Sequence, residues 1–385
     1  MKKLLYILFL FLFGNLFSQE ESQFWTFKEN LTINGYVKYL PSYSFSKGSY
    51  SFINHLLHNR INIKAFLGEK FMINLGIRNR IFVGDFVKKT PNYGKNIAVD
   101  DGQFDLSFLL INSKTLVAHT IFDRASLDFA NKNWQISIGR QRINWGINFA
   151  WNTNDLFNAY NIINFDYEEK AGSDAIRVQH YFTNTTLDVA YKLGNGLDNS
   201  VIAVLYKFNK HKYDFQFLVA NYYNDIAVGT GWAGNIKSAG FKGEATFFSN
   251  KKTHKKVTSI SASIDYFFKQ GMYINTSILY TSNGESTFNP LVLNFTTSTL
   301  SAKKLMPTKY SYLVQVANEF SPRFKANITT IYGAGMDILF VMPSLDYALK
   351  ENWDVNLTGQ FFYAQQQNSF KNINNSIFLR LQYSY

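Results

Sequence analysis

The sequence predicts an all-β protein: a transmembrane antiparallel up-and-down β-barrel of about 18 strands, with 16 as the alternative. Three observations support this. Of the 385 residues, 17% are aromatic and only 17% are charged, whereas an average soluble domain is roughly 25% charged. Beyond the N-terminus, no apolar run approaches the roughly 20 residues of a membrane helix. Apolar and polar residues instead alternate with a period of two, which builds a lipid-facing band from every second residue.

We expect residues 1–19 to be a secretory signal peptide. Lys2 and Lys3 precede the apolar run LLYILFLFLFG, which is too short to span a bilayer, and the small residue Ser18 follows. Residues 20–385 then form a single outer-membrane barrel domain. The chain has no cysteine, so neither a lipidated N-terminal cysteine nor a disulfide framework is expected.

Alternation is clearest in the last strand, where Ile377, Leu379, Leu381, Tyr383 and Tyr385 share one face. An apolar face that ends in an aromatic residue resembles the signal by which the barrel-assembly machinery recognises outer-membrane proteins. That machinery is therefore an expected partner. Wall strands are expected to begin near residues 31, 52, 71, 120, 134, 174, 187, 201, 213, 226, 238, 257, 272, 310, 324, 337, 352 and 375.

Connection lengths orient the predicted barrel. Short connections at 67–70, 131–133, 183–186, 209–212, 269–271, 321–323 and 349–352 alternate with longer ones, and most are flanked by aromatic residues. Short turns are typical of the periplasmic side and aromatic residues of the membrane interface. Both termini are therefore expected in the periplasm. Three long loops, at roughly 84–119, 146–173 and 282–309, lie outside, and the apolar stretch LSFLLINSKTLVAHT of the first is expected to pack in the barrel mouth.

Strand phase directs a set of basic side chains into the lumen, because a charge facing lipid costs several kcal/mol at mid-membrane. The set comprises Lys38, Arg60, Lys64, Arg78, Arg80 and Arg380. Their strands become neighbours when the last strand pairs with the first. Like charges on adjacent strands repel, which favours a functional basic wall. For any single residue the alternative is a structural salt bridge to an inward acid, of which there are six: Asp188, Asp214, Glu244, Asp265, Glu319 and Asp354.

The strand that begins at Trp134 interrupts the alternation. Ile138 points to lipid, so strict alternation would send Arg140 and Arg142 to lipid as well. A β-bulge at Gly139 would instead direct both arginines inward. The same bulge would place Asn144 inward and Ile143 and Trp145 outward. On the following strand, Arg177 is expected to face the lumen.

The loop after this strand carries acidic residues, namely Asp155, Asp166, Glu168, Glu169 and Asp174. If the loop folds into the lumen, its acids oppose the arginines across a narrow gap. A transverse field in a confined channel orients and selects charged solutes. The segment GRQRINWG, followed by WNTNDLFN and FDYEEKAGSDAIR, resembles porin-like outer-membrane β-barrels of Gram-negative bacteria. This resemblance implies a transport channel embedded in outer-membrane lipid, without fixing the solute.

Other functions fit the sequence less well. The formal charge is +12, but the basic residues are spread over alternating strands, which disfavours nucleic acid as a partner. The six histidines form no catalytic constellation and no GxSxG motif is present, so no enzyme activity is expected. We expect no cofactor and no metal. The sequence thus predicts passive diffusion of small hydrophilic solutes with a preference for anions. A transporter of hydrophobic substrates and a partner of a surface complex are the alternatives, and homo-oligomerisation stays open.

Overall fold

The computed structural model describes residues 30–46, 51–159, 162–164, 166, 172–287, 300–366 and 369–385. The expected signal peptide at residues 1–19 lies outside these ranges. Among the described helices, none is long and apolar enough to cross a membrane.

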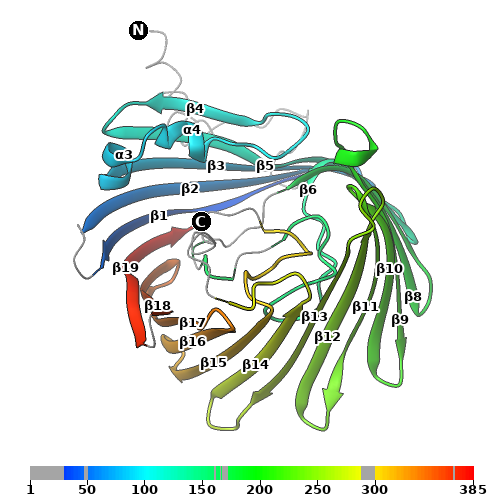
Figure 1. Ribbon diagram of the computed structural model, residues 1–385. Helices are drawn as coiled ribbons and strands as arrows, with labels where there is room; N and C mark the ends of the chain where they lie inside the picture. Colours follow the sequence, from blue (N-terminus) through cyan, green and yellow to red (C-terminus); the bar gives the residue numbers. More distant parts are fainter. Residues whose placement is uncertain are drawn as a thin grey trace, which may run out of the picture.

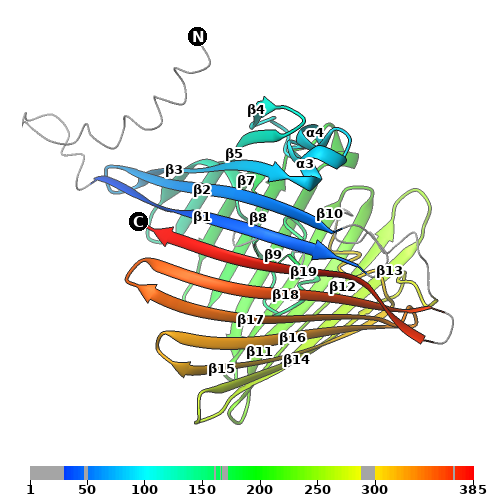
Figure 2. The same ribbon diagram turned by 90° about the vertical axis from the view of Figure 1, so that its left-hand side faces the viewer.

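The described strands form one antiparallel sheet that closes on itself (Figure 1). Strand β1 pairs with both β2 and β19, so the first and last strands lie side by side in the wall (Figure 2). The ring contains 18 strands, which confirms the predicted barrel, and the short strand β4 is added at one place outside this count. The strands are β1 (Leu31–Phe45), β2 (Phe52–Leu67), β3 (Phe71–Gly84), β4 (Ser107–Asn112), β5 (Leu116–Ala130), β6 (Trp134–Gln141), β7 (Ser173–Tyr181), β8 (Thr185–Lys192), β9 (Val201–Lys210), β10 (Tyr213–Tyr222), β11 (Asp225–Ile236), β12 (Ala239–Asn250), β13 (Lys256–Phe267), β14 (Met272–Thr281), β15 (Tyr310–Ser321), β16 (Phe324–Ala334), β17 (Ile338–Lys350), β18 (Trp353–Gln366) and β19 (Ser369–Ser384).

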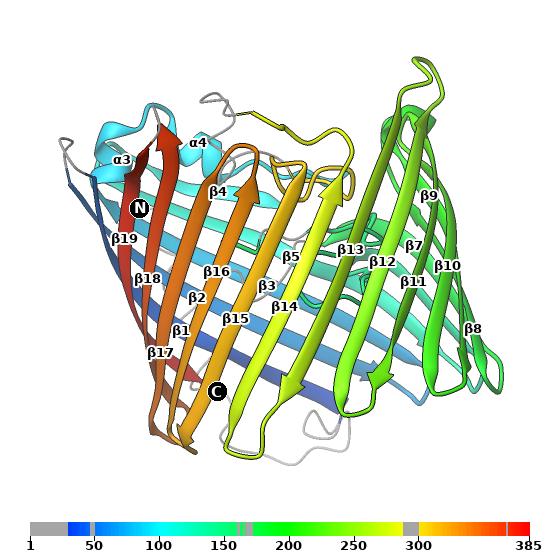
Figure 3. The ribbon, with the colours of Figure 1, turned by 60° about the horizontal axis from the view of Figure 1, so that its bottom comes forward.

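Tight hairpins gather at one end of the barrel (Figure 3). We call this end, which also holds Tyr385, the short-turn rim, and the opposite end the long-loop rim. All seven predicted short connections coincide with hairpins of this rim. Aromatic rings pair across these hairpins, with centroids 5.1 Å apart for Phe71 and Phe129 and 5.5 Å apart for Phe320 and Phe324. These pairs agree with the interfacial girdle expected from the sequence.

The segment 84–119 is not the loop that the sequence suggested. It contains helices α3 (Asp85–Lys89) and α4 (Tyr93–Ile97), strand β4 and the start of β5. The stretch LSFLLINSKTLVAHT forms a hairpin, in which β4 pairs with residues 117–121 of β5. Strand β6 pairs with residues 125–130 of β5. The apolar residues of the stretch are therefore wall residues, and Phe108 and Leu110 are exposed on the surface.

The outer wall is apolar over most strands. Ile202, Val204 and Tyr206 of β9 are about 40% exposed, whereas the alternate residues Ala203 and Leu205 are buried. Large apolar side chains that are left exposed in this regular way need an apolar environment. Because each strand of the ring pairs with a neighbour on both sides and the sheet closes, the barrel meets the requirement for a structure that spans lipid.

The predicted β-bulge at Gly139 is wrong. Pairing of β6 with β5 and with β7 continues through Gly139 without a register shift, opposite Ser126 and Ala175. Gly139 does have an unusual backbone, with φ of +114°. The conflict between strict alternation and arginines that avoid lipid is resolved in another way, because β6 ends at Gln141 and the following residues leave the wall.

Replacing Gly139 by alanine should destabilise the barrel. A Cβ atom at this position would lie 2.3 Å from the carbonyl oxygen of Ala125, and the positive φ adds strain of roughly 1–2 kcal/mol. Gly68, with φ of +66° and no atom within 4 Å of its Cβ position, is the matched control. The denaturant midpoint in lipid vesicles should fall clearly more for Gly139→Ala than for Gly68→Ala. Equal midpoints would show that the wall relaxes around residue 139.

Candidate functional site: the barrel lumen

The described residues among 142–172, namely 142–159, 162–164, 166 and 172, lie between β6 and β7, and we call them the lumen segment. In Figure 1 the ribbon between β6 and β7 lies inside the ring of strands. The described residues 142–159 run as irregular backbone along β8 to β13. Further along, the carbonyl of Ile163 accepts a hydrogen bond from Gln360 of β18 at 2.8 Å. The segment thus contacts opposite parts of the inner wall and narrows the channel.

Glu244 of β12 anchors this segment through its backbone. The carboxylate is completely buried and accepts hydrogen bonds from the amide N–H groups of Ile147 at 2.5 Å and of Asn148 and Asn154 at 2.8 Å. Irregular backbone inside a protein must find partners for its N–H groups. The Glu244 carboxylate accepts hydrogen bonds from three of these N–H groups. It therefore fixes the position of the segment along the barrel axis.

A second anchor lies at the start of the segment. The indole Nε1 of Trp145 donates to Asp188 of β8 at 3.0 Å, and Arg177 of β7 donates to the same carboxylate at 2.5 to 3.2 Å. Gln216 of β10 donates to the carbonyl of Trp145 at 2.9 Å. Arg177 is therefore paired with an acid of the neighbouring strand that also binds the lumen segment.

The expectation that Ile143 and Trp145 face lipid is wrong, because both are fully buried inside the barrel. They pack in an apolar cluster with inward residues of β7 to β13, among them Ala190, Leu205 and Leu218. A second cluster joins Trp151 and Ile163 to β14 to β18. Period-two alternation predicts a water-filled lumen with a polar lining. The lumen segment instead covers part of the inner wall, and its apolar residues form a core with that wall.

The acidic residues of the lumen segment lie beside different wall residues. Asp166 forms an ion pair of 2.7 Å with Lys38 of β1, which is completely buried. Asp155 is also buried, beside Glu244. Glu168 and Glu169 lie outside the described residues. The contact between Asp166 and Lys38 brings the segment to the strands that carry the predicted basic wall.

Two arginines of the predicted basic wall meet at Asp123 of β5. Its carboxylate accepts hydrogen bonds from Arg60 at 2.7 Å and from Arg78 at 3.0 Å. Arg80 donates to His119 at 2.9 Å, next to this group. Two guanidinium groups and one carboxylate leave this set with a net positive charge.

Sequence reasoning missed Asp123, although a signal for it exists. Asp123 and Arg124 are consecutive charges within a strand, so strict alternation would place one of them in lipid at a cost of several kcal/mol. A register shift opposite Gly76 and Ile77 resolves this by placing both charges away from lipid.

Arg140 lies in a buried network at the end of β6 and is only 3% exposed. Its guanidinium donates to Asp174 at 2.7 and 2.9 Å and to Asp100 at 2.6 Å. It also donates to the carbonyl groups of Phe122 at 3.3 Å and Phe104 at 2.6 Å. Arg140 therefore binds β5, β7 and the segment before β4 together at the point where β6 stops.

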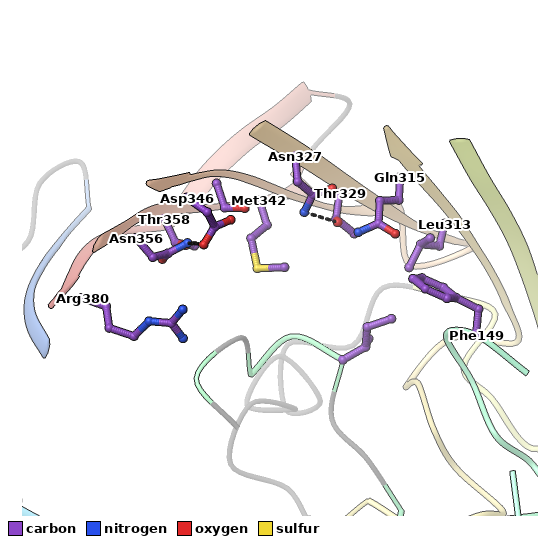
Figure 4. A pocket seen from close by; sticks show the side chains of 12 residues that line it. Phe149, Leu313, Gln315, Asn327, Thr329, Met342, Asp346, Asn356, Thr358 and Arg380 are labelled. Atoms are coloured by element: carbon purple, nitrogen blue, oxygen red, sulfur yellow. Dashed lines mark hydrogen bonds between the residues drawn. The ribbon is translucent and has the colours of Figure 1, made fainter. Parts of the chain in front are cut away.

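The other predicted pore residues are not brought into this network by the described contacts. Arg142 follows the end of β6 and its side chain is exposed. Lys64 is exposed on β2 near the short-turn rim. Arg380 of β19 lines a cavity together with residues of β15 to β18 (Figure 4).

Cavities remain on both sides of the lumen segment. A cavity of about 400 Å³ towards the long-loop rim is lined by Arg78, Asp123 and Arg140 together with Phe157 of the segment. A cavity of about 320 Å³ towards the short-turn rim is lined by Phe149 and Ile162 of the segment and by β15 to β19 (Figure 4). The segment therefore lies between two cavities lined partly by polar side chains.

No family model matches the sequence, and no curated protein matches it. The fold, however, is similar to solved structures. Pseudomonas aeruginosa OccK9 (OpdG) has a TM-score of 0.63 at 8% identity over 93% of this chain and 100% of that chain. The outer membrane protein opdK of Pseudomonas aeruginosa has 0.59 at 7% over 92% and 98%. Acinetobacter baumannii OccAB1 has 0.55 at 10% over 92% and 96%. At these identities the likeness shows a shared fold, that of an outer-membrane β-barrel.

Proposed function

We propose that this protein is a porin-like channel of the outer membrane that lets small hydrophilic solutes diffuse passively, with a preference for anions. The short-turn rim then faces the periplasm. Support comes from the closed apolar-walled barrel, from the fold shared with outer membrane protein opdK, and from cavities on both sides of the lumen segment.

The observation that carries the anion preference is the arrangement around Asp123. Arg60 and Arg78 bond one carboxylate from two adjacent strands, with Arg80 beside them. Excess positive charge in a confined channel attracts anions and repels cations. The pairing of Arg140 and Arg177 with Asp174 and Asp188 assigns these two arginines chiefly to holding the channel in shape.

A transporter of hydrophobic substrates is the second candidate, since part of the inner wall is apolar. Those apolar wall residues, such as Leu205 and Leu218, are buried against Ile143 and Trp145. They are therefore occupied by the chain itself. The surfaces left to solutes carry arginine, aspartate, amide and hydroxyl groups, which fits hydrophilic solutes better.

The purified protein should conduct ions in planar lipid bilayers and show an anion-selective reversal potential in a salt gradient. Changing Arg78 and Arg80 to glutamine should lower the anion-to-cation permeability ratio by about fivefold for each charge, since a unit charge a few ångström away contributes about 1 kcal/mol in water. Lys70→Gln, in an exposed turn, is the control and should leave the ratio unchanged.

Two results would count against the proposal separately. Absence of any ion-sized conductance would remove the channel function. A cation-selective reversal potential in the wild-type protein would remove the anion preference and leave the channel function intact.

A further inference from the structure

The cavity towards the short-turn rim has a lining unlike that of the basic wall. Its volume of about 320 Å³ is at the lower end of the roughly 300–1,000 Å³ of small-molecule sites. Most of its polar groups are neutral amides and hydroxyls on β15 to β18. The charged residues are one acid, Asp346, and one base, Arg380, so their formal charges cancel.

One set of polar groups forms a directed chain of hydrogen bonds. Thr358 donates to Asn356 at 2.7 Å, and the amide of Asn356 donates to Asp346 at 2.7 Å (Figure 4). These donors of Thr358 and Asn356 are therefore already occupied by neighbouring side chains. The chain ends on a carboxylate, which is an acceptor with lone pairs to spare.

Two further acceptors have no donor. The oxygens Gln315 Oε1 and Asn327 Oδ1 are buried and have no hydrogen-bond partner within the described residues. An unpaired buried acceptor is costly, and both residues line the cavity, so either amide gains by turning its oxygen towards a solute that offers a donor. A carboxylate solute supplies only acceptors, whereas a hydroxyl group supplies one donor and two acceptor lone pairs.

An apolar surface borders the same cavity. Phe149 of the lumen segment borders the cavity beside Leu313, and Met342 faces them (Figure 4). The ring of Phe149 is 44% exposed although it lies inside the barrel. Apolar and aromatic walls with a few placed polar groups are typical of sites that bind small organic molecules.

We propose that this cavity is a binding subsite for a neutral polyhydroxylated solute, that is, a mono- or oligosaccharide. Its hydroxyl groups donate to Asp346, Gln315 and Asn327, and the C–H face of a sugar ring packs on Phe149. This subsite rests on the proposed channel function and names one solute class for it. Anion attraction at the basic wall and saccharide binding here are separate properties of two cavities.

The test uses the full-length barrel in planar bilayers, with maltotriose as the probe and poly(ethylene glycol) of equal hydrodynamic radius as the comparison solute. Maltotriose should reduce the ion current in a saturable way, and poly(ethylene glycol), which lacks internal hydroxyl donors, should not. Phe149→Ala should weaken maltotriose binding about tenfold, as expected for the loss of one aromatic contact. Asn327→Ala should weaken it about threefold to tenfold.

The control variant is Asn209→Ala, which removes a similar amide from a different cavity at the same rim. It should leave maltotriose binding unchanged. Calorimetric titration of the detergent-solubilised barrel with maltotriose gives a readout that does not depend on conductance. Ion conductance without saturable binding of maltotriose overturns the subsite and leaves the channel function standing. Binding by calorimetry without conductance supports the subsite and removes the channel function.

Discussion

Glu244→Ala is expected to release the lumen segment and raise the single-channel conductance. The substitution removes the acceptor for the amide N–H groups of Ile147, Asn148 and Asn154. Each buried donor left without a partner costs about 1–3 kcal/mol, so the anchored arrangement loses several kcal/mol. The segment should then sample positions away from β12, and single-channel recordings should show a larger and noisier current.

Asp265→Asn on the neighbouring strand β13 is the control for this effect. The carboxylate of Asp265 is partly exposed and lies 3.6 Å from the ammonium group of Lys242. Its partner is thus a side chain, whereas Glu244 binds backbone N–H groups of the lumen segment. Heat-modifiable migration on gels should confirm that both variants form barrels. An unchanged conductance in a folded Glu244→Ala barrel would show that the apolar clusters alone hold the segment.

Arg140→Ala is expected to be the most destabilising change among the arginines of this region. It leaves Asp174 and Asp100 buried without their common cation, and removing one partner of a buried ion pair typically costs about 3–5 kcal/mol. The carbonyl groups of Phe122 and Phe104 lose a donor at the same time. The midpoint of urea unfolding in lipid vesicles should fall accordingly.

Arg142→Ala provides a matched control two residues away. Its side chain is exposed beyond the end of β6, so the same loss of charge should change the unfolding midpoint little. Equal midpoints for the two variants would contradict the assignment of Arg140 to a structural network.

The barrel could be predicted from the sequence because period-two alternation and aromatic pairs at hairpins are local signals. Ile202, Val204 and Tyr206 point outward for the same reason that Ala203 and Leu205 point inward. Strand β5 begins at Leu116, earlier than the predicted residue 120, because the apolar stretch before residue 120 forms a hairpin with β4.

The inner arrangement could be predicted only in part. Alternation places Arg60, Arg78 and Arg80 on the lumen side, but their partners come from other elements. Asp123 becomes available through a register shift, and Asp100, which pairs with Arg140, lies 40 residues before it in a segment without periodicity. Such contacts depend on where the chain leaves the wall, which no local pattern records.

The same holds for Trp145. Its spacing suits a strand, yet β6 ends at Gln141 and the indole lies in the lumen, bonded to Asp188. An apolar residue gains as much from covering the inside of a barrel as from facing lipid. The alternation alone therefore could not distinguish the two positions.

The seam between β1 and β19 also constrains how the protein folds. It pairs Tyr36 with Ser384, and the hydroxyl of Tyr385 reaches across Gly35 to the carbonyl of Arg60. Strand β1 has no permanent partner on that side until β19 pairs with it. Until then both edges offer unpaired backbone groups, which are templates for aggregation. Such a non-local closing step makes folding slow, so the unfolded chain depends on being shielded until β1 and β19 have paired.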